Sequence, residues 1–324
     1  MVRLIVDCDP GQDDAVALVV AAHFADIVGI TTVGGNAPLA DVTTNALLTC
    51  QLFGIDAEVH AGAVRPLVAA PRHAPEVHGV SGFAGPTLPP LQRQVASGHA
   101  VEYLIETIRA EEGLWLVPIG PMTNVAMAFR HAPDLVDRLA GVSFMGGSAG
   151  AGNRTPTAEF NVLVDPEAAA IVLGSGVPLR MAGLDLTHQF PLDDALADDM
   201  RALGGPGATF LADLFIGYLD RAEGLTGRRR GGLHDPCAVL AVTHPEVVTS
   251  ELRRVDVELD GRLTRGMTVV DQRPAPAGGR ASRPDDAAEA PNVHHGHTID
   301  PTAARALVLE AVAARDRAMA EGEA

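Results

Sequence analysis

The sequence predicts an α/β fold, an open and mainly parallel Rossmann-like sheet with helices on both faces. Short apolar runs that are typical of buried strands alternate with longer helical stretches along most of the chain. Several of these runs end in glycine-containing turns, as in GGN, GPMTN and GGS. With 324 residues and 47% hydrophobic residues, the chain is long enough to bury a large core.

The individual elements are expected at defined places. Strands are predicted at 2–6, 27–33, 114–119, 142–145 and 177–182, and helices at 15–25, 41–53, 124–132, 166–173, 193–203 and 302–320. Near the C-terminus, 252–260 and 264–271 predict a small hairpin around Asp260-Gly261. No repeat or boundary is evident, so a single domain over residues 1–324 is expected.

Charge and cysteine usage narrow the class of protein. The formal net charge is −17, and all 24 cationic side chains are arginine. So acidic a chain would repel a phosphate backbone, which argues against a nucleic acid polymer as partner, and the lack of lysine excludes Schiff-base chemistry. Three widely spaced cysteines suggest no disulfide framework. With no apolar run of the roughly 18 residues that a membrane span needs, and too short an apolar start for a signal peptide, we expect a cytoplasmic protein without membrane contact.

Two segments look irregular. Residues 274–298 are rich in Pro, Ala, Gly and charge, and are expected to form a flexible surface loop in which HHGH is a solvated histidine cluster. Residues 224–235 (GLTGRRRGGLHD) carry three arginines among glycines. This second segment is either a solvated charge run or a mobile flap beside a ligand site.

Polar residues follow several of the predicted strands. Asp7 and Asp9 end the first strand, Asn36 follows the second, Ile119 ends the third and Met145 the fourth. In an open parallel sheet, ligands bind outside the carboxyl ends of the strands, so these residues are expected to share one crevice.

The stretch DCDPGQDDA (7–15) concentrates four aspartates where the first helix begins. A helix N-terminus accommodates one of them as a cap and a second as a favourable charge. It does not account for Asp9 and Asp14 pointing into the same crevice. A hard divalent cation would resolve their repulsion, because Ca²⁺ accepts several carboxylate and carbonyl oxygens. No Cys/His grouping of zinc type lies nearby in the sequence.

DCDPGQDDA also resembles the D-x-D-P-G-x-D-D signature of the nucleoside hydrolases of the inosine–uridine type. The resemblance continues, in the family's order and at similar spacings, through VGGN (33–36), HGVSG (78–82), IGPMTN (119–124), MGGS (145–148), GNRTPTAEFNVLVDPEAA (152–169), HDPCA (234–238) and TRGMTVVD (264–271). Residues 274–298 and the arginine-rich segment are the exceptions. The resemblance implies the nucleoside hydrolase fold and Ca²⁺-dependent hydrolysis of ribonucleosides to ribose and free base.

The resemblance also implies roles for individual residues. It puts Ca²⁺ on Asp9, Asp14, Asp235 and the main-chain carbonyl of Ile119, with Asp9 as the base that activates water. His234 would be the acid for the departing base. Substrate-binding residues would be Asp13, Asn36, His78, Met145, Asn153, Glu159, Phe160, Asn161 and Tyr218.

Each assignment has a structural alternative. Asp235 precedes a proline and could merely cap a helix, Glu159 and Asn161 would share one face of a solvated strand, His78 could be an ordinary loop histidine, and Met145 could be core packing. We prefer the functional interpretation because the residues occur as a set.

The base preference is less constrained. His234 favours an enzyme that is nonspecific or prefers inosine and uridine over a strict purine enzyme, since imidazole suits proton donation near neutral pH. Tyr218 is a second candidate contact to the base, and Trp115 lies within a predicted strand, where it is no obvious stacking platform.

Two other classes of protein remain as alternatives. A phosphatase of the haloacid-dehalogenase type also opens with D-x-D but relies on a lysine, which this chain lacks. A non-catalytic Ca²⁺-dependent nucleoside- or sugar-binding protein would be expected to lose the base or the acid, yet Asp9 and His234 are both present. By resemblance alone, a homodimer or homotetramer is expected.

Overall fold

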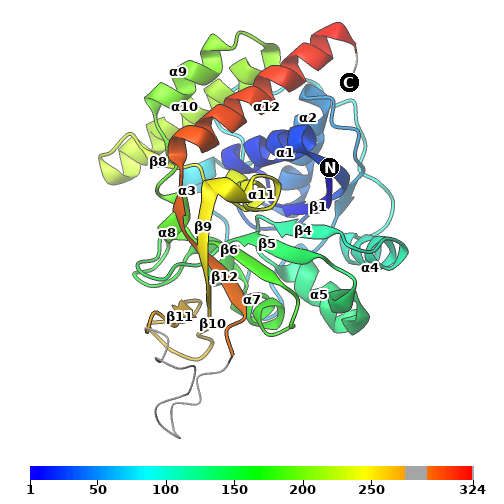
Figure 1. Ribbon diagram of the computed structural model, residues 1–324. Helices are drawn as coiled ribbons and strands as arrows, with labels where there is room; N and C mark the ends of the chain where they lie inside the picture. The colour runs from blue at the N-terminus through cyan, green and yellow to red at the C-terminus, as the bar shows by residue number, and fades with distance from the viewer. Residues whose placement is uncertain (274–289, 323–324) are drawn as a thin grey trace, which may run out of the picture.

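The computed structural model describes residues 1–273 and 290–322, and an eight-stranded sheet forms its centre (Figure 1). Seven strands run parallel, and only the edge strand β9 is antiparallel to its neighbour β12. In spatial order they are β3 (Val59–Ala61), β2 (Ala25–Thr32), β1 (Val2–Cys8), β4 (Trp115–Pro118), β5 (Gly141–Met145), β6 (Leu179–Ala182), β12 (Val293–Ile299) and β9 (Val248–Arg253). The predicted α/β class is confirmed.

Helices cover both faces of this sheet, and each face has its own hydrophobic core (Figure 1). Strand β1 shows why, because successive side chains of a strand point to opposite faces. Leu4 and Val6 pack into one core and Ile5 into the other. The first core is formed with α1 (Gln12–Phe24), α2 (Leu39–Leu52), α9 (Asp194–Ala202), α10 (Pro206–Thr226), α11 (Pro236–Thr243) and α12 (Pro301–Glu321); the second with α4 (Ala100–Ala110), α5 (Thr123–His131) and α7 (Pro166–Leu173).

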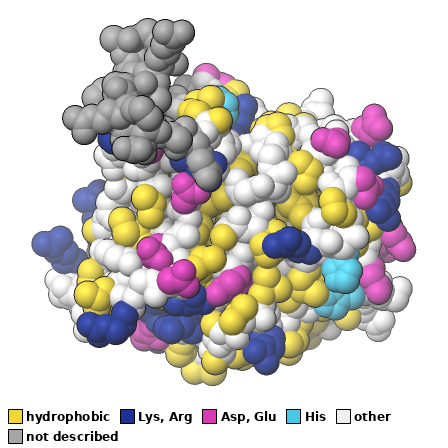
Figure 2. Space-filling view, turned by 90° about the horizontal axis from the view of Figure 1, so that it is seen from below, with side chains coloured by type: hydrophobic (Ala, Val, Ile, Leu, Met, Phe, Trp, Pro, Cys, Tyr) yellow, Lys and Arg dark blue, Asp and Glu magenta, His cyan; other side chains and the backbone are white. Residues whose placement is uncertain are grey.

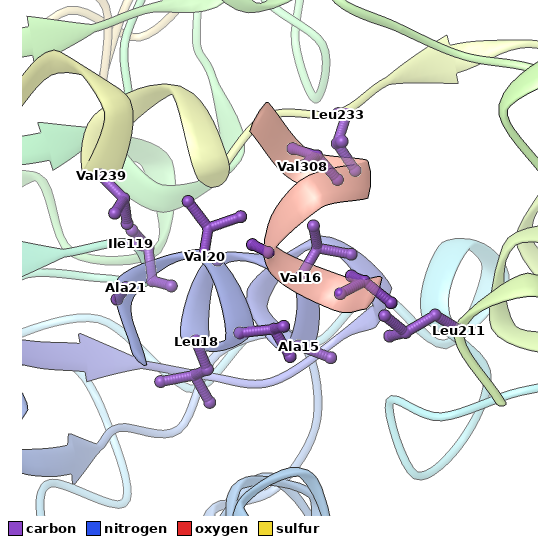
Figure 3. Packing of buried hydrophobic residues seen from close by; sticks show 14 of the residues in the cluster. Ala15, Val16, Leu18, Val20, Ala21, Ile119, Leu211, Leu233, Val239 and Val308 are labelled. Atoms are coloured by element: carbon purple, nitrogen blue, oxygen red, sulfur yellow. The ribbon is translucent and has the colours of Figure 1, made fainter. Parts of the chain in front are cut away.

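Helix α1 is buried along Gln12–Ala21, because it carries apolar side chains on every face. Figure 3 shows five side chains of this helix, Ala15, Val16, Leu18, Val20 and Ala21. They pack among Leu211 of α10, Val239 of α11, Val308 of α12, Ile119 directly after β4, and Leu233 directly after β8. The helix begins at Gln12, three residues before the predicted start, which puts Asp13 and Asp14 in its first turn. The burial of α1 therefore fixes where these two carboxylates lie.

The expectation of a loop over 274–298 is wrong for its last part. Residues 274–289 lie outside the described residues, but 293–298 belong to β12, which pairs with β6 and β9 inside the main sheet. The histidines are not a solvated cluster, because His295 is buried and its Nε2 lies 3.3 Å from Asp185 Oδ2. Adjacent histidines around a glycine gave this strand no apolar alternation, and burial of a histidine depends on a partner that the local sequence does not show.

The predicted C-terminal hairpin is present but shorter than expected. Strand β10 (Val255–Val257) pairs antiparallel with β11 (Thr268–Val270), whereas Leu252 belongs to β9 and pairs with His294 in the main sheet. A second small pair joins β7 (Pro191–Leu192) to β8 (Gly231–Gly232). The short helices α3 (Pro75–His78), α6 (Phe160–Val164) and α8 (Leu184–Thr187), and 3₁₀ turns at Pro133–Asp137 and Pro245–Val247, complete the described elements.

On the surface, arginines lie beside carboxylates, as in the Arg109–Asp134 and Arg305–Asp199 pairs, both 2.7 Å apart. On the face seen in Figure 2, arginine and acidic side chains are likewise neighbours. Among the described helices, none has the length and apolar character to span a bilayer. The positive charge of these arginines is therefore balanced by neighbouring carboxylates.

Candidate active site

A cavity of about 580 Å³ opens at the carboxyl ends of the parallel strands. Asn36 follows β2, Ile119 follows β4 and Met145 ends β5, and all three line this cavity. The crevice predicted from the positions of the polar residues is therefore present. Asp7 and Asp9 are not among the residues that line it: the Asp7 carboxylate accepts hydrogen bonds from Thr31 (2.6 Å) and Asn124 (2.8 Å), and that of Asp9 accepts one from the Asn36 amide.

Three buried carboxylates meet beside the cavity. Each of Asp13, Asp14 and Asp235 offers an oxygen within 4.8 Å of the other two. Asp14 is also the capping carboxylate of α1, accepting hydrogen bonds from the amides of Gly11 (2.9 Å) and Asp9 (3.1 Å). The helix-cap alternative thus explains two bonds of Asp14, but not the presence of Asp13 and Asp235 beside it.

The pKa values of this group show the cost of the arrangement. Burial, followed by the charge of Asp14, raises the pKa of Asp13 to about 7, and burial raises the pKa of Asp14 to about 6. Burial and the neighbouring carboxylates hold the pKa of Asp9 and of Asp235 well above the usual range. Without a cation, this group resists full ionisation at neutral pH.

The Asp9 carboxylate lies between the glycine loops after β2 and β4. Its Oδ2 accepts a hydrogen bond from the Asn36 amide at 2.6 Å, and its Oδ1 has no partner. A Cβ on Gly35 would overlap the Asp9 carboxylate, and a Cβ on Gly120 would lie 2.5 Å from Oδ1. Both loops need glycine because the carboxylate lies directly between them.

These donors fit a hard divalent cation. Buried Asp9 Oδ1 and Asp13 Oδ1 lack hydrogen-bond partners, which is costly for a carboxylate unless a cation compensates. The Ile119 carbonyl, the fourth expected ligand, accepts a hydrogen bond from Asn161 Nδ2 at 2.9 Å and keeps a second lone pair. All donors are oxygens, which is the set that Ca²⁺ and Mg²⁺ take in proteins.

Glu159 organises the loop after β5. It is the N-cap of α6, so the structural alternative in which Glu159 and Asn161 share one face of a solvated strand is wrong. Its carboxylate accepts from the amides of Asn161 (2.7 Å), Gly147 (2.9 Å) and Val162 (3.1 Å), and burial raises its pKa. Asn161 in turn donates to the carbonyls of Ile119 and Met145. Glu159 thereby ties the β5 loop and α6 together at the cavity.

The rest of this side of the cavity is mixed in character. Asn153, Phe160 and Arg154 line it, with the Arg154 guanidinium 5.5 Å from the centre of the Phe160 ring. Arg154 also pairs with Glu76, so its charge is compensated.

The opposite wall carries imidazoles and a phenol. His78 Nδ1 lies 2.8 Å from Gln12 Oε1, and His234 Nδ1 lies 2.7 Å from Thr187 Oγ1. Burial lowers the pKa of His78 to about 4 and that of His234 to about 3. Tyr218 lies close to Gly231, where any Cβ would overlap its hydroxyl, and burial raises its pKa to about 12. This wall is therefore uncharged at neutral pH.

Several cavity residues were not anticipated from the sequence: Gln12, Ala74, Val77, His188 and Ala222. Gln12 occupies the variable position of the aspartate motif, and nothing in the local pattern marks His188. Thr226, Arg228 and Arg230 also line the cavity. Of the two interpretations of the arginine-rich segment, its position agrees with the one that put it beside a ligand site.

Residues 4–306 match the sequence model of a family described as inosine-uridine preferring nucleoside hydrolase. The chain belongs to this family.

A pyrimidine-specific ribonucleoside hydrolase (RihB) of Escherichia coli is 38% identical over 273 residues, covering 83% of this chain and 87% of the relative. Among solved structures, a purine-preferring ribonucleoside hydrolase from Gardnerella vaginalis superposes with a TM-score of 0.87 at 28% identity, covering 97% and 99% of the two chains. An inosine-guanosine nucleoside hydrolase gives 0.86 at 29% identity, covering 96% and 99%. This nucleoside hydrolase is therefore an enzyme that acts on N-glycosidic bonds, and the phosphatase alternative is wrong.

Proposed function

We propose that this nucleoside hydrolase cleaves ribonucleosides to ribose and free base with Ca²⁺ held by Asp9, Asp14, Asp235 and the carbonyl of Ile119. The observation that carries the proposal is the group of buried carboxylates of Asp13, Asp14 and Asp235, whose oxygens approach within 4.8 Å. Asp9 is not part of this group, but its buried Oδ1 has no hydrogen-bond partner and is free to bind a cation. Four carboxylates with raised pKa values have no arginine among their hydrogen-bond partners in the described part of the chain. A divalent cation supplies the missing charge and lowers the pKa of a nearby water.

Short polar side chains bind the ribose hydroxyls. We assign Asp13, Asn36 and Asn161 to the 2′- and 3′-hydroxyls, and Asn153 and Glu159 to the 5′-hydroxyl. Met145 and Phe160 form the apolar wall beside the sugar. Both carboxylate oxygens of Glu159 accept hydrogen bonds from main-chain amides, one of them that of Asn161. Besides binding the 5′-hydroxyl, Glu159 therefore holds Asn161 in place.

In the reaction, water attacks the anomeric carbon while the bond to the base breaks through an oxocarbenium-like state. Asp9 takes the proton of the water, for which its unpartnered Oδ1 is available. The electron pair of the broken bond stays on the base, which takes up a proton from water after it has left. Tyr218, His78 and His234 contact the base, and His234 assists its departure.

For the base, we propose uridine as the preferred substrate, with inosine second. The curated relative at 38% identity is named pyrimidine-specific, whereas the solved structures named for purines are 28–29% identical. The wall facing the base offers an amide, imidazoles and a phenol, while Trp115 is not among the residues that line the cavity.

A nucleoside panel tests this function. Uridine, cytidine, inosine, adenosine and thymidine are incubated with purified enzyme, and free base and reducing sugar are measured with Ca²⁺ and after chelation. We expect the largest kcat/KM with uridine and loss of turnover on chelation, restored by Ca²⁺. Binding without turnover would support the non-catalytic alternative. Full activity in chelator would show that the reaction does not require a divalent cation.

We further propose that the protein is cytoplasmic and a homodimer or homotetramer. Light scattering coupled to size-exclusion chromatography gives the oligomeric state directly, and a monomer would contradict the second part.

A further inference from the structure

Two distant segments of the chain are joined beside the base side of the cavity. The end of α8 leads into β7, and β8 leads into His234 and α11. Pro191 pairs with Gly232 and Leu192 with Gly231, and the Leu233 amide donates to the Phe190 carbonyl at 2.8 Å. This pairing holds Thr187 against His234, although 47 residues separate them.

The contact between these residues is short and enclosed. Thr187 Oγ1 lies 2.7 Å from His234 Nδ1, and the threonine is fully buried. The imidazole also packs against Gly232, where a Cβ would lie 2.7 Å from His234 Cε1. The ring is therefore held in one orientation by a hydroxyl and a glycine.

The direction of the hydrogen bond follows from counting partners. Among the described residues, Thr187 Oγ1 has no other hydrogen-bond partner than His234 Nδ1. If Nδ1 carried the proton, the buried hydroxyl proton would have no acceptor, and a buried unsatisfied donor is strongly disfavoured. Thr187 therefore donates, and Nδ1 accepts. In a neutral imidazole whose Nδ1 accepts, the proton is on Nε2.

We propose that Thr187 is a positioning residue that holds His234 as the neutral tautomer with its proton on Nε2, ready to donate to the departing base. Nε2 makes no hydrogen bond with the described residues, and His234 lines the cavity. This inference rests on the proposed function and gives its leaving-group step a specific form. As the bond to the base breaks, the electron pair moves onto the base, and the Nε2–H donates a hydrogen bond to it.

The consequence is a preference among bases. A hydrogen-bond donor that keeps its proton stabilises a base that can carry the negative charge on carbonyl oxygens. Uracil and hypoxanthine, with their oxo groups, suit such a donor better than the amino-bearing cytosine and adenine. An imidazolium acid would make less distinction, since it transfers its proton outright.

The test compares Thr187→Val, which keeps the shape but removes the hydroxyl, with Thr187→Ser, which restores it. The matched control is Thr49→Val, because Thr49 is equally buried and donates to the Asn45 carbonyl at 2.9 Å within α2. Each Ca²⁺-loaded variant is assayed with uridine and with p-nitrophenyl riboside, whose phenolate leaves without help. Nitrogen-15 spectra of the histidines report the tautomer of His234, with His234→Ala used to assign its signals.

For Thr187→Val we expect kcat/KM for uridine to fall roughly 10- to 100-fold, with p-nitrophenyl riboside changed by less than about 3-fold. Thr187→Ser and Thr49→Val should stay within a few-fold of the parent on both substrates. In the parent spectra, Nδ1 should show the shift of an unprotonated nitrogen and Nε2 that of a protonated one, and Thr187→Val should lose this single tautomer.

A protonated Nδ1 in the parent enzyme, or equal slowing of both substrates by Thr187→Val, would overturn the inference. The spectra need no turnover, so they decide the role of Thr187 even if the nucleoside panel shows that the proposed substrates are wrong. An inactive parent with the expected tautomer would thus refute the function and support the hydrogen-bond assignment.

Discussion

The two sides of the cavity respond to burial in opposite ways, the carboxylates being almost fully buried and His78 and His234 partly so. On the carboxylate side, burial raises the pKa of Asp13 to about 7 and that of Asp14 to about 6. On the imidazole side, burial lowers the pKa of His78 to about 4 and that of His234 to about 3. In each case burial disfavours the charged form.

The comparison shows which side of the cavity needs a bound cation for its side chains to act. The imidazoles are neutral at pH 7 as they stand, and a neutral imidazole can still donate one hydrogen bond and accept another. The carboxylates must be ionised to act as ligands or as a base, so they depend on a cation. The carboxylate side is therefore completed by an ion, and the imidazole side by its neighbours within the chain.

The largest effect is expected on the carboxylate side, from Asp235→Asn. Removing one of the three clustered carboxylates should abolish tight Ca²⁺ binding and lower turnover of uridine by on the order of 10³-fold or more, because several kcal/mol of charge stabilisation are lost. Metal analysis and kinetics measure both. Asp260→Asn, at an exposed position, is the control. Stoichiometric calcium in the purified Asp235→Asn variant would show that the ligand assignment is wrong.

Asp9→Asn should follow. The amide keeps the shape and one oxygen but cannot take the proton of the attacking water, so kcat should fall roughly 10²- to 10⁴-fold. Uridine and p-nitrophenyl riboside should be slowed alike, because both need the same water. A variant within a few-fold of the parent would exclude Asp9 as the base.

On the imidazole side, His234→Ala should discriminate between substrates instead. Uridine should slow about 10²-fold more than p-nitrophenyl riboside, which corresponds to about 2.7 kcal/mol specific to the natural leaving group. Steady-state kinetics with both substrates measures the difference. Equal losses accompanied by weaker calcium binding would instead make His234 a structural neighbour of Asp235.

The smallest effect concerns stability against pH, and its sign differs between the two sides. Carboxylates with raised pKa values hold protons in the folded state that the unfolded chain has released, so they stabilise the metal-free protein near pH 4 and this contribution is lost by about pH 7. The imidazoles act oppositely, because their lowered pKa values make the fold lose stability as the pH falls below about 6.5.

Calcium separates the two contributions, since it acts on the carboxylates alone. Urea unfolding in chelator and in excess Ca²⁺ should give stabilities that diverge from pH 4.5 to pH 8, by on the order of a few kcal/mol. A difference that does not change over this range would mean that the carboxylates are not the calcium ligands.

Much of the fold was predictable because the strands and helices of the sheet are locally encoded. Helix α7 begins and ends where its apolar run predicts, after Asp165 and the helix-starting Pro166. The edge of the sheet at which the cavity lies was predictable for a related reason: in a parallel sheet, the residues that follow the strands share one edge. Strand order and chain direction together therefore bring Asn36, Ile119 and Met145 to one cavity.

The hydrogen-bond and packing partners of the buried polar residues depended on the tertiary structure. By itself the sequence determined the α/β class, the motif carboxylates and the places of helices such as α7, because these follow from short-range periodicity and residue type. Only the folded chain decided that β12 is an inner strand, that Glu159 caps α6 and that Thr187 contacts His234. Each of these rests on a buried polar group finding a partner far away in the sequence, and burial with hydrogen bonding is a property of the packed structure rather than of any local stretch.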